Sequence, residues 1–437
     1  MSGNMNPTTA ASPQTTTQVK IGDAPASRVI SFEVTIGSMS LTPASGSAVT
    51  VLAGSQRVEL THLSATSEPL SALKVPQGSY NSASFTVSSP EITFINNVGA
   101  VQKFESSVSK TITVSFSPAL TIGASSSIVD IDLNIANSLT LDALGNVTGA
   151  NLSASSFTFG LATVAAEDKQ GHDDGELEDT TGVITSVNGS SFVLTVDQTG
   201  APLTFSTDAN TRLEEGAVIA VNKIVTVEGV TKSDGTLYAK EVEGIEDETG
   251  AEAEGLINSI TGSPATQLTF VADHGMGSGM DDTKVGSSIT ADVSKAQYKV
   301  KKGDVDTSGI GGLPSSEFPF DATTVHAGQR IELESDVALN GSTINAEKVK
   351  LQQQALVGTV SGLSGPTTAG PVTFTLIVDA DSAFAMLSGK AQVTVFWQPG
   401  TDLHNISSVD NCQSVRVRGL VFFTGSNFNL IARRIDK

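Results

Sequence analysis

The sequence contains little of three kinds of side chain that commonly hold proteins together or carry chemistry. It has one cysteine, Cys412, so no disulfide can form within the chain. Aromatic residues make up 5% and charged residues 16% of the chain. The cores must therefore consist of Val, Ile, Leu and Ala, and the surface of Ser, Thr, Asn, Gln and Gly. With no histidine beside it, Cys412 is expected to be a small buried side chain rather than a nucleophile.

Long hydrophobic runs are also absent. No stretch approaches the ~20 apolar residues that a membrane-spanning helix needs. Residues 1–18 are rich in Thr, Ser, Asn and Pro and have neither the basic nor the apolar part of a signal peptide. Two interpretations stay open: the protein remains inside the cell, or an export signal has been removed. The Ser/Thr-rich, cysteine-poor composition favours the second, which predicts an extracellular or cell-surface protein.

Positive charge is scarce as well. The chain has 25 Lys and Arg against 46 Asp and Glu, a formal net charge of -21. Such a charge keeps a protein soluble and repels phosphate backbones and anionic membranes. We therefore expect no nucleic-acid partner and no transmembrane segment.

Alternating apolar and polar residues dominate the first third of the chain. Residues 30–36, 112–116 and 129–135 each place Ile, Val, Leu or Phe at every second position. This period is typical of antiparallel strands with one buried and one wet face. Several such runs predict a β-sandwich over residues 19–163, preceded by a polar extension at residues 1–18. A short helix is expected at residues 63–73.

A β-rich pattern then repeats three times. The copies span residues 181–247, 248–353 and 354–437 and open at Gly182, Gly255 and Gly358. Each copy predicts five or six short strands with no helix to cover a face, so each must close on itself. A small barrel of the oligonucleotide/oligosaccharide-binding type does this. The predicted fold class is all-β: an N-terminal β-sandwich followed by three small β-barrel-like repeats.

The sequence also predicts the connections between these units. Residues 164–180 and 241–254 are acidic and are expected to be solvated linkers. Asp234-Gly235 and Asn340-Gly341 predict type I′ hairpin turns. The second repeat carries a long insertion from Asp273 to about Phe320. The third contains one helical turn at residues 381–387.

Both halves of the chain resemble uncharacterised bacterial families. The segment from about 18 to 162 carries Gly22-Asp23-Ala24-Pro25 before a strand, and later Pro76-Gln77-Gly78-Ser79-Tyr80. In these residues it resembles a β-sandwich family of cell-envelope lipoproteins, which implies export. The chain departs from that family because it shows no lipobox cysteine near its start.

The three repeats share the pattern Gly-x-Ile/Val-x-Ser-Val, a Val-x-Val-x-Gly strand, and Asp-Gly-x-x-x-Ala-x-x-Val. In this pattern they resemble a second bacterial family of small, OB-like β-barrels. Neither resemblance brings a catalytic site that can be carried over to this chain.

Candidate chemistry is sparse. No two of the five histidines stand at metal-ligand spacing, and no nucleophile or phosphate-binding motif is present. The glycine-rich residues 275–279 are expected to form a flexible loop. The aromatic residues are densest at Phe396, Trp397, Phe422 and Phe423, and we expect them in a core.

One short string resembles a metal-binding loop. Asp304, Asp306 and Ser308, followed by Gly309, reproduce the first half of an EF-hand-type calcium loop. The acid expected at the twelfth position is replaced by Ser315. Calcium at this loop is the single cofactor that the sequence suggests, and a plain Asx-rich turn is the alternative.

Two segments are candidate contacts between copies of the chain. A Thr-rich strand with little charge can add to the sheet edge of a neighbour. The basic C-terminus can meet an acidic linker of the next subunit, which would build a head-to-tail filament. The residues concerned are Thr15, Thr16, Thr17 and Val19 at one end, and Arg416, Arg418, Arg433 and Arg434 at the other.

Three classes of function follow. The leading hypothesis is a non-enzymatic extracellular or cell-surface structural protein, a subunit that self-assembles or decorates a surface. The alternative is an adhesion or ligand-binding module that holds a surface glycan or another envelope component. The third is an enzyme, for which the separated carboxylates would have to converge in the fold.

Overall fold

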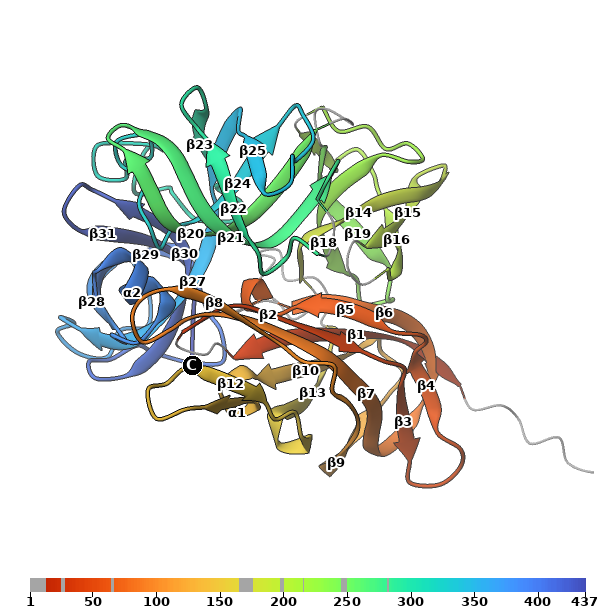
Figure 1. Ribbon diagram of the computed structural model, residues 1–437. Coiled ribbons are helices and arrows are strands. Elements are labelled where there is room, and N and C mark those ends of the chain that lie inside the picture. The colour runs from red at the N-terminus through yellow and green to blue at the C-terminus, as the bar shows by residue number, and fades with distance from the viewer. Residues whose placement is uncertain are drawn as a thin grey trace, which may run out of the picture.

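The structure is a computed structural model that describes residues 13–24, 28–63, 67–164, 176–196, 200–214, 216–244, 250–280 and 283–437 (Figure 1). These residues form 31 strands, two short α-helices and two 3-10 turns. The predicted all-β fold with barrel-like repeats is therefore confirmed. None of the helices formed by these residues is long and apolar enough to cross a membrane.

The first domain is a sandwich of two sheets. One sheet has the order β13-β10-β1-β6, and the other has the order β4-β3-β7-β2-β5, with β8 and β9 both paired to β7. Their inner faces enclose one apolar core. The elements are β1 Gln14–Ala24, β2 Val29–Ile36, β3 Met39–Pro43, β4 Val49–Leu52, β5 Gln56–Glu59, η1 Thr61–Leu63, β6 Ser67–Pro76, β7 Gly78–Ile95, β8 Val101–Glu105, β9 Ser109–Ile122, β10 Ser127–Asn134, α1 Ile135–Ser138, β11 Leu139–Leu141, β12 Val147–Ala150, η2 Ala154–Ser156 and β13 Phe157–Thr163.

Two local predictions for this domain are wrong. The helix expected at residues 63–73 is the turn η1 followed by strand β6, because Leu70 and Val75 face the core while β6 pairs with β1. The boundary at residue 18 is wrong too. β1 begins at Gln14 and is hydrogen-bonded on both sides, to β10 and to β6. Residues 1–12 of the predicted extension lie outside the described residues.

Barrel 1 contains β14 Glu176–Asn188, β15 Ser191–Val196, β16 Pro202–Ser206, β17 Arg212–Glu214, β18 Ile224–Thr231 and β19 Leu237–Gly244. The strands follow the order β16-β15-β14-β18-β19, and a parallel pairing of β16 with β19 closes the ring. This five-stranded antiparallel ring with one parallel closure is the arrangement of an OB-type barrel.

Barrel 3 repeats the same ring. Its elements are β27 Gln353–Ser361, β28 Val372–Val378, α2 Ala383–Ser388, β29 Gln392–Leu403, β30 Ser414–Phe423 and β31 Phe428–Asp436. They close as β27-β28-β29-β31-β30, with β29 and β31 parallel. The helical turn expected at residues 381–387 is present as α2.

Barrel 2 has the same order with a broken fifth strand. It contains β20 Ala251–Gly262, β21 Ala265–Gly277, β22 Ser288–Asp292, β23 Gln297–Val300, β24 Arg330–Ser335, β25 Thr343–Asn345 and β26 Lys348–Leu351. β25 pairs with β22 and β26 pairs with β24. Across the break, the Ala346 amide donates to the Asp292 carbonyl (2.9 Å) and the Glu347 amide to the Glu334 carbonyl (2.8 Å), so the ring continues.

The glycine that opens each repeat has a packing cause. A Cβ added at Gly182, Gly255 or Gly358 would lie 2.2, 2.0 or 2.5 Å from a carbonyl oxygen of the second strand. The first two strands of each barrel therefore approach so closely that no side chain fits. This close approach of the two strands explains why the Gly-x-Ile/Val pattern recurs in the three repeats.

Several smaller predictions need correction. Only Gly235 and Gly341 have positive φ in their turns, so neither turn is of type I′, which needs two such residues.

Residues 273–277 belong to β21 and not to an insertion, so the glycine-rich segment 275–279 begins in a strand. The extra chain of barrel 2 starts after β22. Cys412 is exposed, in a turn at φ 65°, and not buried.

The four domains contact one another. Figure 1 shows barrels 1 and 2 above the sandwich and barrel 3 beside it. Thr93 of β7 donates to the Gly286 carbonyl of barrel 2 (2.7 Å), and Thr231 of barrel 1 donates to Gln18 of β1 (2.9 Å). Gln329 of barrel 2 donates to the Val421 carbonyl of barrel 3 (2.7 Å). Barrel 2 thus contacts both the sandwich and barrel 3.

Candidate functional site at the domain junction

The same face of all three barrels points to one central junction. In each barrel the opening glycine of the first strand stands opposite a Val or Ile of the fourth strand. The neighbouring outward positions are therefore equivalent between barrels. They carry Thr181 and Thr226 in barrel 1, Glu254 and Glu332 in barrel 2, and Val357 and Arg416 in barrel 3.

Arg330, the first residue of β24, is the centre of this junction. Its Nη1 and Nη2 atoms donate to the two carboxylate oxygens of Asp273 (2.6 and 2.9 Å), and its Nε donates to Glu254 (2.8 Å). Its backbone amide donates to Gln354 of β27 (2.7 Å). Because a guanidinium is planar and forked, it can bind two carboxylates at once and fix their positions.

The sandwich contributes a second buried pair. His62 in η1 lies with its Nδ1 atom 2.8 Å from Oε2 of Glu59, at the end of β5. The Glu59 carboxylate also accepts from the Phe32 amide (2.8 Å) and the Thr61 hydroxyl (2.7 Å), so its buried charge is well satisfied. The ring centroids of His62 and His274 are 6.1 Å apart, which joins the sandwich to β21 of barrel 2.

A third cluster joins barrels 1 and 2. Glu243 of β19 pairs with Lys301 (2.9 Å) and with Lys350 (3.0 Å). Lys350 also pairs with Glu332 (3.0 Å) and Glu334. The ammonium groups thus bridge carboxylates of two separate barrels.

Burial and charge set the protonation of these groups. Burial raises the pKa of Asp273 to about 7 despite the nearby Arg330. Burial also opposes ionisation of Glu254, but Arg330 outweighs it and holds the pKa of Glu254 at about 2. Two carboxylates share one guanidinium, so one stays ionised while the other takes up a proton near neutral pH.

The other two clusters show the same competition. Burial works against the charge of His62, but the bond to Glu59 outweighs it and raises the pKa of His62. Burial of Glu243 is outweighed by Lys301 and Lys350, which hold its pKa at about 2. These groups therefore keep their charges inside the molecule because each has a partner.

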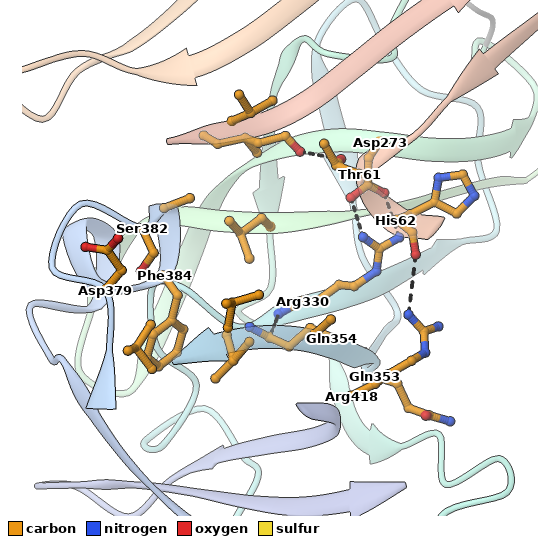
Figure 2. Close-up of a pocket in the computed structure, with 18 residues that line it drawn as sticks. Thr61, His62, Asp273, Arg330, Gln353, Gln354, Asp379, Ser382, Phe384 and Arg418 are labelled. Atoms are coloured by element: carbon orange, nitrogen blue, oxygen red, sulfur yellow. Dashed lines mark hydrogen bonds and ion pairs between the residues drawn. The ribbon is translucent and has the colours of Figure 1, made fainter. Parts of the chain in front are cut away.

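A cavity of about 190 Å³ opens beside Arg330 and His62 (Figure 2). Its walls come from the sandwich, barrel 2 and barrel 3. Figure 2 shows His62, Asp273, Arg330 and Arg418 at one end, and Asp379, Ser382 and Phe384 at the other. The apolar walls between the ends are formed by Val29, Ile30, Leu256, Leu356, Val357 and Val378.

The predicted calcium loop is not assembled as a metal site. Asp306 accepts from the Ser308 amide (2.8 Å), which is an Asx turn, and from the Gly400 amide of barrel 3 (2.9 Å). Asp304 lies 3.7 Å from Arg433. The described residues contain no group of three or more His, Cys, Asp or Glu placed to hold a metal ion. The loop attaches barrel 2 to barrel 3 and contains the Asx turn of the alternative prediction, while calcium binding there stays a prediction.

The predicted N-terminal contacts lie inside the chain. The Thr15 hydroxyl donates to the Gly123 carbonyl (2.6 Å), and Thr17 and Val19 are buried in β1. Thr16 accepts from Lys74 (2.6 Å). In residues 17–22 both edges of this strand are occupied by β6 and β10 of the same chain, while in residues 14–16 it pairs with β6. Pairing of this strand with a neighbouring copy stays a prediction.

The predicted C-terminal contacts are also used within the chain. Arg416 binds Asp436 (2.8 Å) and Arg434 binds Asp402 (2.9 Å). Arg418 donates to the His62 carbonyl (3.4 Å), and Arg433 is 2% exposed. These side chains balance carboxylates and carbonyls between and within domains, and a contact of the basic end with an acidic linker of a neighbouring subunit stays a prediction.

The linker prediction is wrong for residues 241–244 and 251–254, which lie in strands, while residues 245–249 lie outside the described residues. Glu243 lies in β19 and Glu254 in β20, and both side chains are about 15% exposed. Residues 176–180 likewise belong to β14, while residues 165–175 lie outside the described residues. The sequence pattern indicated that these acids are solvated, because their cationic partners lie tens of residues away along the chain.

Comparisons with known proteins give family names without functions. Residues 14–152 match the family described as Domain of unknown function (DUF4382), and residues 181–243 match Domain of unknown function (DUF5666). No curated protein matches the chain.

Two solved structures are similar over part of the chain. One is Drosophila Unr CSD456, at 9% identity and a TM-score of 0.13, covering 58% of this chain and 95% of that one. The other is a multidomain protein with nucleic acid binding domains from Streptococcus pneumoniae TIGR4, at 9% identity and a TM-score of 0.11, covering 58% and 72%. At these TM-scores the likeness carries no argument about function.

Proposed function

We propose that this protein is a non-enzymatic binding module of the exported, cell-surface kind, which holds a small amphipathic ligand at its domain junction. The observation that carries the proposal is the cavity of about 190 Å³ between the sandwich, barrel 2 and barrel 3. Pockets with apolar walls and a few convergent polar groups are the usual form of a ligand site.

The two parts of the cavity indicate the chemistry of the ligand. Aliphatic side chains such as Leu256 and Val378 fit an apolar body. Arg418 and His62 line the charged end, and the raised pKa of His62 favours its cationic form. A short aliphatic carboxylate meets both requirements.

The polar groups of the cavity support binding rather than catalysis. The Thr61 hydroxyl is engaged with the Ile30 carbonyl (2.7 Å) and with Glu59, and the Ser382 hydroxyl accepts the Ala385 amide (3.1 Å). Arg330 is engaged by Asp273 and Glu254. A nucleophile needs a base within reach and a free path to substrate, and these groups are already engaged in hydrogen bonds and ion pairs within their own domains.

The outer faces of the second and third strands support a partner other than nucleic acid. In barrel 1 they present Val193, Thr195 and Thr204, and in barrel 3 Thr373 and Thr375. OB-type domains that bind single-stranded nucleic acid use cationic grooves and stacking aromatic rings on this face. These hydroxyl-rich faces present no cations, and the outward Phe396 ring of β29 packs against Phe318 of barrel 2 and is not an open stacking platform.

The aromatic residues weaken the glycan version of the binding hypothesis. Trp397 is 1% exposed and Phe422 is fully buried, which agrees with their predicted place in a core. They offer no open platform for a sugar ring. We therefore prefer an amphipathic anion to a glycan.

Calorimetric titration tests the proposal. The protein is titrated with straight-chain carboxylates of increasing length and with the alcohols of the same lengths. We expect carboxylates to bind more tightly than alcohols and affinity to rise with chain length until the cavity is full. Failure of every member to bind the folded protein would overturn the proposal.

A matched pair of variants locates the binding. Val357→Trp places a large ring at the mouth of the cavity, where Val357 is 39% exposed, and is expected to abolish binding. Thr359→Trp stands two residues further along the same strand, outside the cavity, and should leave affinity unchanged. Equal effects of the two variants would place the ligand elsewhere.

A surface-assembly role is a second candidate. One specific observation favours it: the described part of the sandwich ends on one side in two strands whose outer edges carry no partner strand.

A further inference from the structure

The two sides of the sandwich are built differently. On one side the sheets are tied together, because the Ser71 hydroxyl of β6 donates to the Val51 carbonyl (2.5 Å) and the Gln56 amide donates to the Leu70 carbonyl (2.8 Å). Barrel 1 covers the same side, with Ala72 packed against its core. The edge strands on this side therefore contact the opposite sheet and barrel 1.

The opposite side ends in β9 and β13. Within the described residues, β9 pairs only with β7 and β13 only with β10. The ring centroids of Phe116 in β9 and Phe159 in β13 are 5.3 Å apart, and both side chains are half-buried at the rim of the core. In Figure 1, β9 reaches the edge of the molecule away from barrels 1 and 2.

Along residues 111–115 of β9 this open side carries no charge, proline or bulge, while Lys110, Pro118 and the register break after Ser115 bound that stretch. β9 has 14 residues with one charge, Lys110, and β13 has seven residues with none. Edge strands of soluble proteins are usually short, charged or covered, since unpaired N–H and C=O groups attract another strand. On a chain with a net charge of -21, an edge that carries a single positive charge adds no repulsion between acidic groups of two copies.

We propose that β9 pairs with β9 of a second copy, antiparallel, about a two-fold axis at Thr113. This register places Thr111 opposite Ser115 and Ile112 opposite Val114. Lys110 then stands opposite Phe116, so the two lysines do not face each other. The two half-buried Phe116 rings become covered at the new interface. The contact is isologous and closes on itself, so it makes a dimer and not an open filament.

Sedimentation of the full chain over a range of concentrations tests the dimer. We expect a reversible monomer–dimer equilibrium in the wild type. Thr113→Lys places two ammonium groups opposite each other at the axis and should raise the dimer Kd at least about tenfold. Thr113 is exposed, so this variant is expected to fold, and circular dichroism checks that it does.

Thr359→Lys is the matched control. Thr359 is an exposed threonine of β27, whose two edges are both paired, so a lysine there should leave the dimer unchanged. A wild type that stays monomeric at every concentration would overturn the proposal. So would a dimer that survives Thr113→Lys, or one that Thr359→Lys disrupts to the same extent.

Cross-linking gives a second measurement that does not depend on dimer affinity. In a Cys412→Ser background, Thr113→Cys should form an interchain disulfide on mild oxidation, because residues at the axis of an antiparallel pair lie about 5 Å apart between Cα atoms. Thr359→Cys in the same background should not. Equal cross-linking at both positions, or none at Thr113→Cys, would overturn the register and with it the proposal.

Discussion

Barrel 1 and barrel 2 share a strand order and a glycine at the same register position, yet they present different chemistry to the junction. In barrel 1 the outward pair is Thr181 and Thr226, whose hydroxyls are 2.9 Å apart. In barrel 2 the equivalent pair is Glu254 and Glu332, both held by cations. The inward positions of the two barrels are apolar alike.

The difference follows from position in the molecule. Barrel 2 contacts the sandwich and both other barrels, so its outward face has partners on several sides. Lys301 and Lys350 of barrel 2 bind Glu243 of barrel 1, and the Arg330 amide donates to Gln354 of barrel 3. The Arg330 guanidinium binds Glu254 and Asp273 of barrel 2 itself, so these carboxylates hold the residue that makes the contact. A repeat can therefore keep its fold through its inward residues while its outward residues are specialised for assembly.

The strongest test of this contrast removes the central cation. Arg330→Met would leave Asp273 and Glu254 buried without their guanidinium, which is expected to lower the free energy of unfolding by about 3–5 kcal/mol. Ser414→Met is the control, since Ser414 is the equivalent residue of barrel 3 and is exposed. It should change stability by less than about 0.5 kcal/mol. Urea unfolding measures the free energy of unfolding of both variants. Equal losses would show that the buried Arg330 contributes no more to stability than an exposed residue.

The pH dependence of unfolding examines the same groups. The pKa of Asp273 is about 7 in the folded protein against an ordinary 3.8, so the folded state holds an extra proton between these values. Unfolding free energy is therefore expected to rise as pH falls from about 8 to about 5, by at most about 1.4 kcal/mol per pKa unit. The raised pKa of His62 acts in the same direction.

Below that range the sign reverses. Glu254 and Glu243 have pKa values of about 2, so their stabilisation is present above their ordinary pKa of 4.5 and is lost as pH falls toward 2. Stability should be greatest near pH 5. Denaturant unfolding across this range measures the curve. Asp273→Asn should flatten its neutral arm, and a maximum at neutral pH in the wild type would contradict the assignment.

A glycine substitution probes what the barrels have in common. Gly255→Ala would place a Cβ 2.0 Å from the Val271 carbonyl oxygen, and the forced shift is expected to cost about 1–3 kcal/mol. Gly182→Ala should behave alike in barrel 1, where the distance is 2.2 Å. Gly312→Ala meets nothing within 4 Å and serves as the control. Thermal unfolding of the three variants measures these losses of stability. A much larger loss in one barrel than in the other would show that the two barrels differ in their strand packing too.

The smallest effect is expected on the polar face of barrel 1. Thr226→Val removes the hydroxyl that bonds to Thr181 and should cost about 0.5–1.5 kcal/mol. Because Thr226 is half-buried, water can partly replace the hydrogen bond that Thr181 loses. A loss as large as that of Arg330→Met, measured under the same conditions, would mean that barrel 1 supports the junction as strongly as barrel 2.

Much of the fold was predictable from local pattern. Alternation at residues 30–36 and 129–135 predicted strands that the structure contains, and Gly182, Gly255 and Gly358 marked the three barrels. The helix expected at residues 63–73 failed because Leu70 and Val75 also satisfy a strand that a partner holds in place. Pairing with β1 decided between the two, and a pairing partner fifty residues away has no local signal.

The site was much less predictable. Arg330 and Asp273 are 57 residues apart, and His62 and Arg418 are 356 apart. The one usable hint was the number of acids in residues 241–254, which stood out in a chain of low charge. They were interpreted as a linker because their cationic partners belong to other strands and other domains.

The sequence by itself determined the class of each domain, because side-chain alternation and glycine placement act over a few residues and need only neighbouring strands to have their effect. The tertiary structure decided which outward charges are buried, which edge of the sandwich stays open and where the cavity lies. Those properties depend on distances between residues far apart in the chain, and such distances exist only once the four domains have packed together.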